Sequence, residues 1–340
     1  MNRAVHVLLL GLAMVVVAGP VRAGTDTLNQ LIERFILPHY QALALTAEAQ
    51  EKAWSEFCAK PDPKGFKGLQ RAYLATADSW SQIEFLRYGP IGDEFRAERL
   101  SYWPERKNAT AKGLTQLLER DGVADLAPEL FFKISVAAQG LPALERLLFD
   151  ENAQTEMLSG ARRERRCAVG EAIAWNIVTI AHDVRLGWTN DVVEAIANPD
   201  TAKEATSRIA TDFLASFAFM RDSKLRPVLG KDVAEARPQL AEGWRSKRSR
   251  RALELNLETI LDVSKIIMKG KEGDTPMTIA TALSFAEALP DDFAPAVADI
   301  KQRQQFYLVL DALAAARDKA HDEIPAVLGV TVGFNSQDGD

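Results

Sequence analysis

Apolar residues recur at the three- to four-residue spacing of an amphipathic helix along nearly the whole chain, and no segment alternates apolar and polar residues as a strand does. This pattern predicts an all-α protein with no significant sheet. Pro38 falls inside the first expected helix, where its ring and its missing N–H group predict a kink. The expected helices span residues 25–58, 63–88, 109–120, 128–139, 142–149, 152–198, 201–222, 248–269, 275–289 and 292–324.

Two irregular stretches interrupt this helical pattern. Residues 89–108 and 224–249 both contain glycine and proline, the first also holds three aromatic residues, and neither keeps a helical period. Both are longer than the ordinary connection between two helices, and long loops in helical proteins often carry function. We therefore expect a site to involve one or both of them.

The N-terminus has the pattern of a secretory signal. Arg3 precedes a nearly continuous apolar run from Ala4 to Ala18, and Val21-Arg22-Ala23 forms a small-x-small cleavage site. The run is too short to span a bilayer comfortably, and no cysteine follows it to carry a lipid. We expect a signal peptide at 1–23, cleavage after Ala23, no stable membrane anchor, and a periplasmic or secreted product.

The net charge of the chain argues against one class of partner, the nucleic acids. The chain has 41 Lys and Arg against 47 Asp and Glu, a formal net charge of −6. The signal contains arginines but no acidic residue, so its loss makes the net charge more negative. Proteins that bind nucleic acid through bulk electrostatics carry an excess of positive charge. No nucleic-acid partner is expected.

The chain has two cysteines, Cys58 and Cys167. In an exported protein an even number of cysteines favours a disulfide, and closing a loop of about 110 residues contributes roughly 4–5 kcal/mol in the chain-entropy model. The alternative is a metal ligand or a catalytic thiol. Because no histidine lies near either cysteine in the sequence, we favour the disulfide.

The most informative segment is Gly-Leu-Pro-Ala-Leu-Glu-Arg-Leu-Leu-Phe at 140–149. Gly140 ends the preceding helix, Pro142 suits the first turn of a new one, and Glu145 in that turn suits the positive end of the helix dipole. A carboxylate among apolar neighbours has a raised pKa unless a cation pairs with it. Glu145 is thus a helix-start acid, the partner of Arg146 or another arginine, or a binding group.

A second candidate group lies on the helix expected at 63–88. Trp80, Glu84 and Arg87 are spaced i, i+4 and i+7, so they share one face. An acid and an arginine beside a tryptophan indicate a partly buried, ion-paired binding site. The alternative is a surface pair between Glu84 and Arg87, which stabilises a helix by less than about 0.5 kcal/mol.

The 140–149 segment resembles the signature of the imelysin-like proteins, an exported all-helical family whose motif is Gly-x-His-x-x-Glu. Gly140 and Glu145 fall on its glycine and glutamate, and Pro142 stands at the histidine position. Other segments resemble the family in the same order along the chain, and the last of them resembles a lipoprotein-like subgroup in which proline also replaces the histidine. These segments are Trp80–Pro90, Tyr102–Glu105, and Trp244–Ser246 followed by Ser249 and Asn256.

The resemblance implies two packed helical bundles with a site in the cleft between them. We expect the first bundle at 24–198, the second at 199–325 and a flexible tail at 326–340. The expected binding residues come from the segments that carry the resemblance. They are Glu84, Arg87, Trp103, Gly140, Pro142, Glu145, Arg245 and Ser246.

The resemblance also implies a role in iron acquisition. We predict a binding or accessory protein for iron or another cation, working beside an outer-membrane uptake system. Hard cations prefer oxygen ligands, so Glu84 and Glu145 are the candidate metal ligands, provided that they face one another across a cleft. No catalytic residue is assigned.

Two other functions stay open. The family's historical name implies a metallopeptidase, but Pro142 replaces the motif histidine, and His39, His182 and His321 form no zinc-binding pattern. Alternatively, the chain is a helical scaffold for a partner, in which the motif residues fix the packing of the bundles.

Overall fold

The computed structural model describes residues 20–332, with side chains from Asp26 onward. Over this range the chain is built from helices without a strand, which confirms the all-α prediction. The α-helices are α1 Pro20–Leu31, α2 Leu37–Ala59, α3 Pro63–Ser81, α4 Arg96–Leu100, α5 Ala109–Glu119, α6 Pro128–Phe131, α7 Leu141–Phe149, α8 Ala153–Ser159, α9 Arg163–Gly187, α10 Val193–Ala195, α11 Pro199–Ala218, α12 Arg226–Leu229, α13 Ser249–Ile267, α14 Thr275–Glu287, α15 Phe293–Ala298 and α16 Ile300–Leu328.

Shorter turns of other helix types connect them. Wider π-helical segments lie at Ile32–Ile36, Trp188–Val192 and Phe219–Leu225. The first π-helical segment ends two residues before Pro38, which lies in the first turn of α2, and the kink expected at this proline stays a prediction. Tighter 3₁₀ turns lie at Pro90–Phe95, Ala124–Leu126, Val136–Ala138 and Pro238–Leu240.

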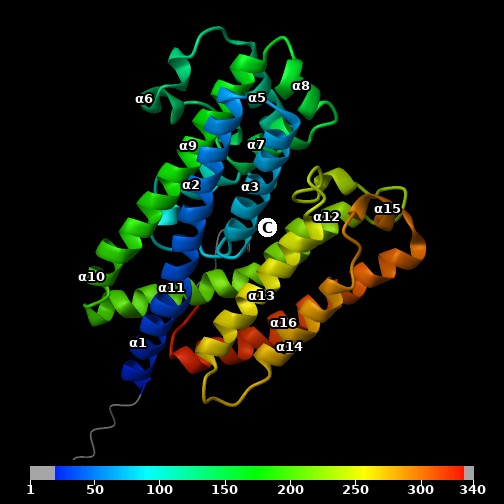
Figure 1. Cartoon of the computed structure of the whole chain (residues 1–340). Coiled ribbons are helices and arrows are strands. Elements are labelled where there is room, and N and C mark those ends of the chain that lie inside the picture. The colour runs from blue at the N-terminus through cyan, green and yellow to red at the C-terminus, as the bar shows by residue number, and fades with distance from the viewer. Residues whose placement is uncertain (1–19, 333–340) are drawn as a thin grey trace, which may run out of the picture.

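The helices form two packed bundles (Figure 1). In one bundle α2 packs against both α3 and α9, and α7 lies against α3 and α9. In the other, α14 packs between α13 and α16, and α16 also contacts α11. Although α1 begins the described chain, it contacts α11, α13 and α16 of the second bundle. The chain limits expected for the two bundles stay a prediction.

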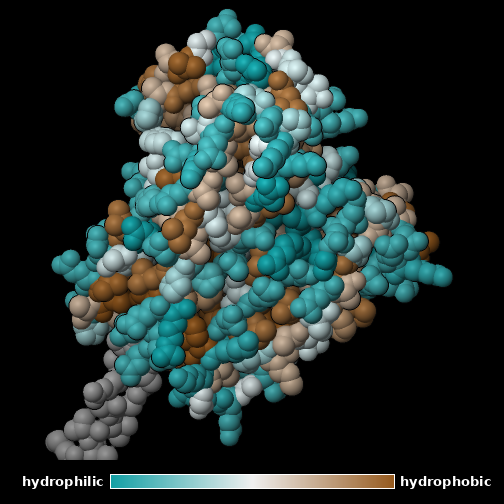
Figure 2. Space-filling view, viewed as in Figure 1, coloured by the Kyte–Doolittle hydropathy of each residue, from teal (hydrophilic) through white to brown (hydrophobic). Residues whose placement is uncertain are grey.

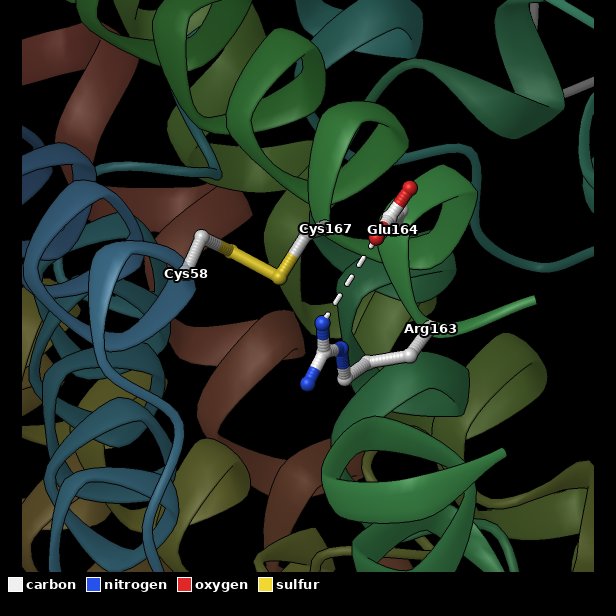
Figure 3. Close-up of a disulfide and its surroundings, with 4 residues drawn as sticks. All are labelled: Cys58, Arg163, Glu164 and Cys167. Atoms are coloured by element: carbon white, nitrogen blue, oxygen red, sulfur yellow. Dashed lines mark ion pairs between the residues drawn. A yellow bond between two sulfur atoms is a disulfide. The ribbon is translucent and has the colours of Figure 1, made fainter. Parts of the chain in front are cut away.

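The first bundle is locked by a disulfide between α2 and α9. Cys58 and Cys167 are joined (Figure 3), as the sequence predicts. One turn farther along α9, a Cβ atom on Gly170 would lie 2.1 Å from the ring of the buried Trp54. The close approach of the two helices at this point therefore requires glycine. Figure 3 also shows the Arg163–Glu164 pair, 3.7 Å apart, in the first turn of α9 beside the disulfide.

Four expected helices are shorter than predicted or divided, and the one expected at 63–88 ends at Ser81. The segment 152–198 is interrupted at Gly160, which has an extended backbone and separates α8 from α9. The segment 128–139 holds only α6 and a 3₁₀ turn, because Gln139 donates its side-chain amide to the carbonyls of Phe132 (3.3 Å) and Ile134 (2.7 Å). The segment 292–324 is divided by Asp299, whose carboxylate caps the N-terminus of α16.

The structure describes only part of the two terminal segments, the expected signal peptide and the expected flexible tail. Most of the expected signal peptide lies outside the described residues, and α1 begins at Pro20. At the other end α16 continues to Leu328, and Ser207 donates its hydroxyl to the carbonyl of Thr331 (2.6 Å), so the expected tail overlaps ordered structure. Residues 333–340 of that tail lie outside the described residues.

No helix between residues 20 and 332 is both long and apolar enough to cross a membrane. Hydrophilic residues cover most of the face shown in Figure 2, and apolar residues form separate patches among them.

Candidate functional site

The site is centred on Glu145, in the first turns of α7. Its side chain is 5 % exposed. Ser246, from the irregular segment before α13, donates its backbone N–H (3.0 Å) and its hydroxyl (2.7 Å) to Glu145 Oε1. These two bonds connect the motif helix of the first bundle to the chain that leads into the second.

Local sequence explains how Glu145 reaches this position. A Cβ atom on Gly140 would lie 2.1 Å from the carbonyl oxygen of Leu100, so only glycine allows α7 to begin so close to the end of α4. Pro142 occupies the first turn of α7, where a missing N–H group costs no hydrogen bond. On the other side, Gly243 adopts a positive φ of 64°, which turns the chain so that Ser246 faces Glu145.

Burial raises the pKa of Glu145 above the ordinary glutamate value of 4.5. The two bonds from Ser246 and the positive charges of Arg245 and Arg248 oppose this shift without cancelling it. Neither arginine lies within 4.0 Å of the carboxylate among the described residues. The Glu145 carboxylate is therefore held mainly by neutral donors, and it has no direct ion-pair partner.

A cavity of about 260 Å³ opens beside this carboxylate. Of the residues expected to bind a ligand, Trp103, Pro142, Glu145 and Arg245 line it, while Ser246 anchors Glu145 at its edge. Arg245 is stacked 4.2 Å from the ring of Trp244 and donates to Asp150 (2.5 Å). We call this cavity the Glu145 cleft.

Three polar groups that line the Glu145 cleft have no partner in the described chain. Thr110 is 1 % exposed and its hydroxyl makes no hydrogen bond. The Nε–H group of Arg146 also lacks an acceptor, and both bonds to Glu145 go to Oε1, so Oε2 accepts none. Buried polar groups are nearly always hydrogen-bonded, so the buried Thr110 hydroxyl and Arg146 Nε–H group indicate a water or ligand partner, and Glu145 Oε2 is an acceptor left open beside them.

Glu84 lies in a different cluster, immediately after α3. It is 3 % exposed and accepts hydrogen bonds from the Lys224 ammonium and from Asn256 Nδ2 (2.8 Å). Lys224 also donates to Glu242 Oε2 (2.6 Å) and lies 5.7 Å from the ring centre of Trp103. Glu84, Lys224 and Glu242 form what we call the Lys224 cluster.

Burial, followed by the neighbouring Glu242, raises the pKa of Glu84, and Lys224 opposes the shift. One ammonium thus serves two carboxylates, the buried one of Glu84 and the partly exposed one of Glu242. The second carboxylate is also attracted by Arg248, which is 6 % exposed and donates to Asp78 (2.7 Å). The cluster joins the end of α3 to α13 and to the segment that precedes it.

The other expected site residues are distributed differently from the prediction. Arg87 does not pair with Glu84; its guanidinium lies 5.6 Å from the Trp80 ring and it lines a separate cleft. Arg146 does not pair with Glu145; it binds Asn108 (2.8 Å), Glu105 (3.5 Å) and Asp150 (3.6 Å). Gly140 acts through close packing and lies outside the cavity lining.

The two candidate metal ligands have different partners, and only Glu145 lines the cleft. Over residues 20–332, no group of three or more His, Cys, Asp and Glu is placed to hold a metal ion. The donor set of the described chain therefore does not fit a resident metal coordinated by protein side chains alone.

Sequence reasoning missed Lys224, Glu242, Thr110 and Arg146 as members of the site. Lys224 and Glu242 lie in the irregular stretch 224–249, which was expected to matter as a loop without any assignment of its charged residues. A lysine directly before the apolar Leu225, within a segment bounded by aromatic Phe219, was the available signal for burial. Thr110 and Arg146 carried no signal in the sequence.

The sequence of the chain places it in a known family. A sequence model of a peptidase family, described as Imelysin, matches residues 36–326. The chain belongs to the imelysin family. The resemblance found in the motif segments is thereby confirmed over most of the chain.

Among the family's relatives, iron-regulated protein A of Synechococcus elongatus is 22 % identical over 124 residues. This match covers 36 % of the present chain and only 31 % of that relative. The name of this relative refers to iron, and the match covers about a third of its length.

Two solved structures share the fold. An imelysin-like protein from Psychrobacter arcticum 273-4 has a TM-score of 0.75 at 18 % identity, over 94 % of this chain and 100 % of that one. A protein from Parabacteroides distasonis, described as an iron-regulated protein A precursor, has a TM-score of 0.68 at 14 % identity, over 92 % and 96 % of the two chains. At these identities the likeness establishes the fold alone.

Proposed function

We propose that this imelysin-family chain is an exported binding protein in iron acquisition, and that it takes iron as a small complex in the Glu145 cleft. The observation that carries the proposal is the set of unpartnered polar groups beside a buried carboxylate with one open oxygen. The names of the relatives from Synechococcus elongatus and Parabacteroides distasonis support the link to iron.

The chemistry of the cleft favours a complexed ion over a bare one. A hard cation such as ferric iron prefers several oxygen ligands. Glu105 and Asp222 also line the cleft but pair with arginines, so Glu145 Oε2 is the carboxylate oxygen that the described lining leaves open. The remaining donors must come with the ligand. Glu145 would complete the coordination of an iron ion that is already largely chelated.

The walls of the cleft suit the organic part of such a complex. Trp103 and Trp244 supply aromatic surface, and Thr110 and Arg146 add polar side chains to the lining. Their Oγ1 and Nε atoms are buried, so contact with the chelator requires these side chains to move. A cavity of about 260 Å³ is slightly below the range of typical small-molecule sites. The ligand is therefore a compact complex.

The sequence pattern of the N-terminus and the disulfide support export. The pattern of residues 1–23 is that of a cleaved signal, and the Cys58–Cys167 disulfide is of the kind that persists in oxidising compartments. In that compartment the protein would work beside an outer-membrane iron-uptake system, receiving or holding the complex.

Binding of ferric nitrilotriacetate tests the proposal, because this chelator leaves coordination positions of the iron open to a protein ligand. Calorimetric titration should give saturable, one-to-one binding of the ferric complex, and no comparable binding of metal-free nitrilotriacetate or of ferrous ion alone. Absence of binding by the ferric complex would refute the proposal. Equal binding by the metal-free chelator would show that iron plays no part in recognition.

A further inference from the structure

A second cleft, separate from the Glu145 cleft, lies where the turn after α3 meets the end of α9 and the side of α11. Its volume is about 830 Å³, and none of its lining residues lines the Glu145 cleft. Arg87 and Tyr88 come from the turn, and Arg208 comes from α11. It is thus built, like the Glu145 cleft, from both bundles.

Arg87 brings an unmatched guanidinium to this cleft. Its side chain makes no hydrogen bond or ion pair within the described residues, and its contact is the face of Trp80 at 5.6 Å. The neighbouring acid, Asp212 of α11, uses Oδ2 to accept the backbone N–H groups of Arg87 and Tyr88, at 2.7 Å each. Asp212 therefore holds the turn in place and leaves the guanidinium donors of Arg87 open to the cleft.

Arg208 brings a second open guanidinium. It lies on the exposed side of α11, one helical turn before Asp212, and no acid of the described chain is within 4.0 Å of it. The charges of Arg87 and Arg208 both act on the Asp212 carboxylate, and that of Arg208 also acts on the Tyr88 phenol, so the groups are near one another. The Tyr88 hydroxyl has no partner among residues 20–332 either.

The other charged groups make no ion pair with these two arginines in the described chain, although the lining holds three arginines and three aspartates and Glu204 acts on Tyr88. Arg96 is engaged by Asp93 (3.5 Å), Glu94 (3.4 Å) and Asp183 (3.9 Å). Asp191 also lines the cleft and has no ion pair in the described chain. A ligand seated at Arg87 and Arg208 therefore has to be compact enough to keep its negative charge away from Asp191.

We propose that this second cleft is a binding site for a small oxyanion, either a phosphate group or a dicarboxylate, held by Arg87, Arg208 and Tyr88. A guanidinium presents planar, paired N–H donors that match the oxygens of carboxylate or phosphate. Two such forks and one phenol line this cleft without an acceptor among the described residues. The inference does not depend on the iron-binding proposal, because the two clefts share no residue.

Inorganic phosphate and succinate are the two probes, titrated separately into the full chain by calorimetry at low ionic strength. We expect saturable binding of at least one probe, weakened by added salt because the site is electrostatic. Arg87→Gln and Arg208→Gln should each weaken it by about tenfold or more, as expected for loss of a charge-assisted hydrogen bond. Phosphate binding alone, or succinate binding alone, identifies which oxyanion the cleft takes.

The controls separate a built site from general charge. Arg71→Gln removes an exposed arginine of α3 that lines neither cleft, and it should leave binding unchanged. Arg208→Gln, at an exposed position, serves as the folding-safe variant if Arg87→Gln destabilises the turn. Binding of neither probe, or binding that all three variants retain equally, would overturn the inference.

Discussion

Glu145 and Glu84 are both buried carboxylates at the junction of the two bundles, yet their charges are balanced in opposite ways. Glu84 shares the Lys224 ammonium with Glu242 and accepts a further bond from Asn256. Glu145 is held by the neutral donors of Ser246 and keeps one oxygen open to a cavity. The first arrangement uses the carboxylate to join the bundles, and the second leaves it available for a ligand.

This difference shows what separates a structural acid from a binding acid. Burial raises the pKa of both groups, so the shift does not distinguish them. The distinguishing features are the identity of the partner and the presence of unpartnered polar atoms nearby, here Thr110 Oγ1 and Arg146 Nε. Variants of the two groups should accordingly separate stability from binding.

The largest loss of stability is expected when Glu84 loses its cation, Lys224. Lys224→Met leaves Glu84 and Glu242 without their shared cation, and loss of one partner of a buried pair costs about 3–5 kcal/mol. Because two carboxylates lose the cation, we expect about 5 kcal/mol in the free energy of unfolding, measured with urea. Lys265→Ala, which removes an exposed ion pair with Asp262, should change it by less than about 0.5 kcal/mol. A loss below 1 kcal/mol for Lys224→Met would contradict the structural role.

The disulfide should matter for stability and leave the Glu145 cleft intact. Replacing Cys58 and Cys167 by serine frees a loop with a sequence separation of 109 residues, and we expect a loss of about 4 kcal/mol in unfolding free energy. Since the bond joins α2 and α9 and neither cysteine lines the cleft, the folded variant should bind ferric nitrilotriacetate like the wild type. Weakened binding by the fully folded variant would show that the two regions are coupled.

Ser246→Ala should produce a moderate loss. It removes the hydroxyl bond to Glu145 and keeps the backbone bond, so about 1–2 kcal/mol of stability is expected to be lost on chemical denaturation. Ligand binding should weaken only slightly, because Oε2 is not affected. A loss of binding as complete as that caused by changing Glu145 itself would mean that the anchor and the binding atom cannot be separated.

The smallest expected effect is in the pH dependence of stability. Burial raises the folded-state pKa of Glu145 above 4.5, so the folded protein binds this proton more tightly than the unfolded chain. The contribution is fully present below about pH 4.5 and is lost as the pH rises through the folded pKa. Glu145→Gln does not titrate, so its stability should fall less than that of the wild type over this window. Parallel thermal-melting profiles for the two proteins would contradict the shift.

The sequence predicted the helical class and the cysteine pairing, because both follow from local pattern or compartment. The structure places Glu145, Trp103, Pro142 and Arg245 in one cleft lining, and only the resemblance had linked these segments, which are distant in the chain. Arg87 lines a different cleft, because α3 ends at Ser81 whereas the helical spacing was expected to continue to 88. The turn after Ser81 sends Glu84 and Arg87 to different sites.

The sequence alone could not show which residue pairs with each charged group. Glu84 is paired with Lys224, 140 residues away, and Glu145 with Ser246, 101 residues away. Such pairs depend on how the two bundles dock, and no period within a segment specifies that docking. The same limit applies to Thr110, whose importance arises from a missing partner.

We propose that Glu145 Oε2 binds the ligand while Oε1 accepts the two hydrogen bonds from Ser246 that join the bundles. The variant Glu145→Gln separates these two roles. Glutamine keeps an oxygen for the two Ser246 bonds and replaces the open oxygen by an NH₂ group, which cannot bind a cation. The dissociation constant for ferric nitrilotriacetate should rise by at least about tenfold in a variant whose unfolding free energy stays within about 1 kcal/mol of wild type. Unchanged affinity in that folded variant would contradict the account.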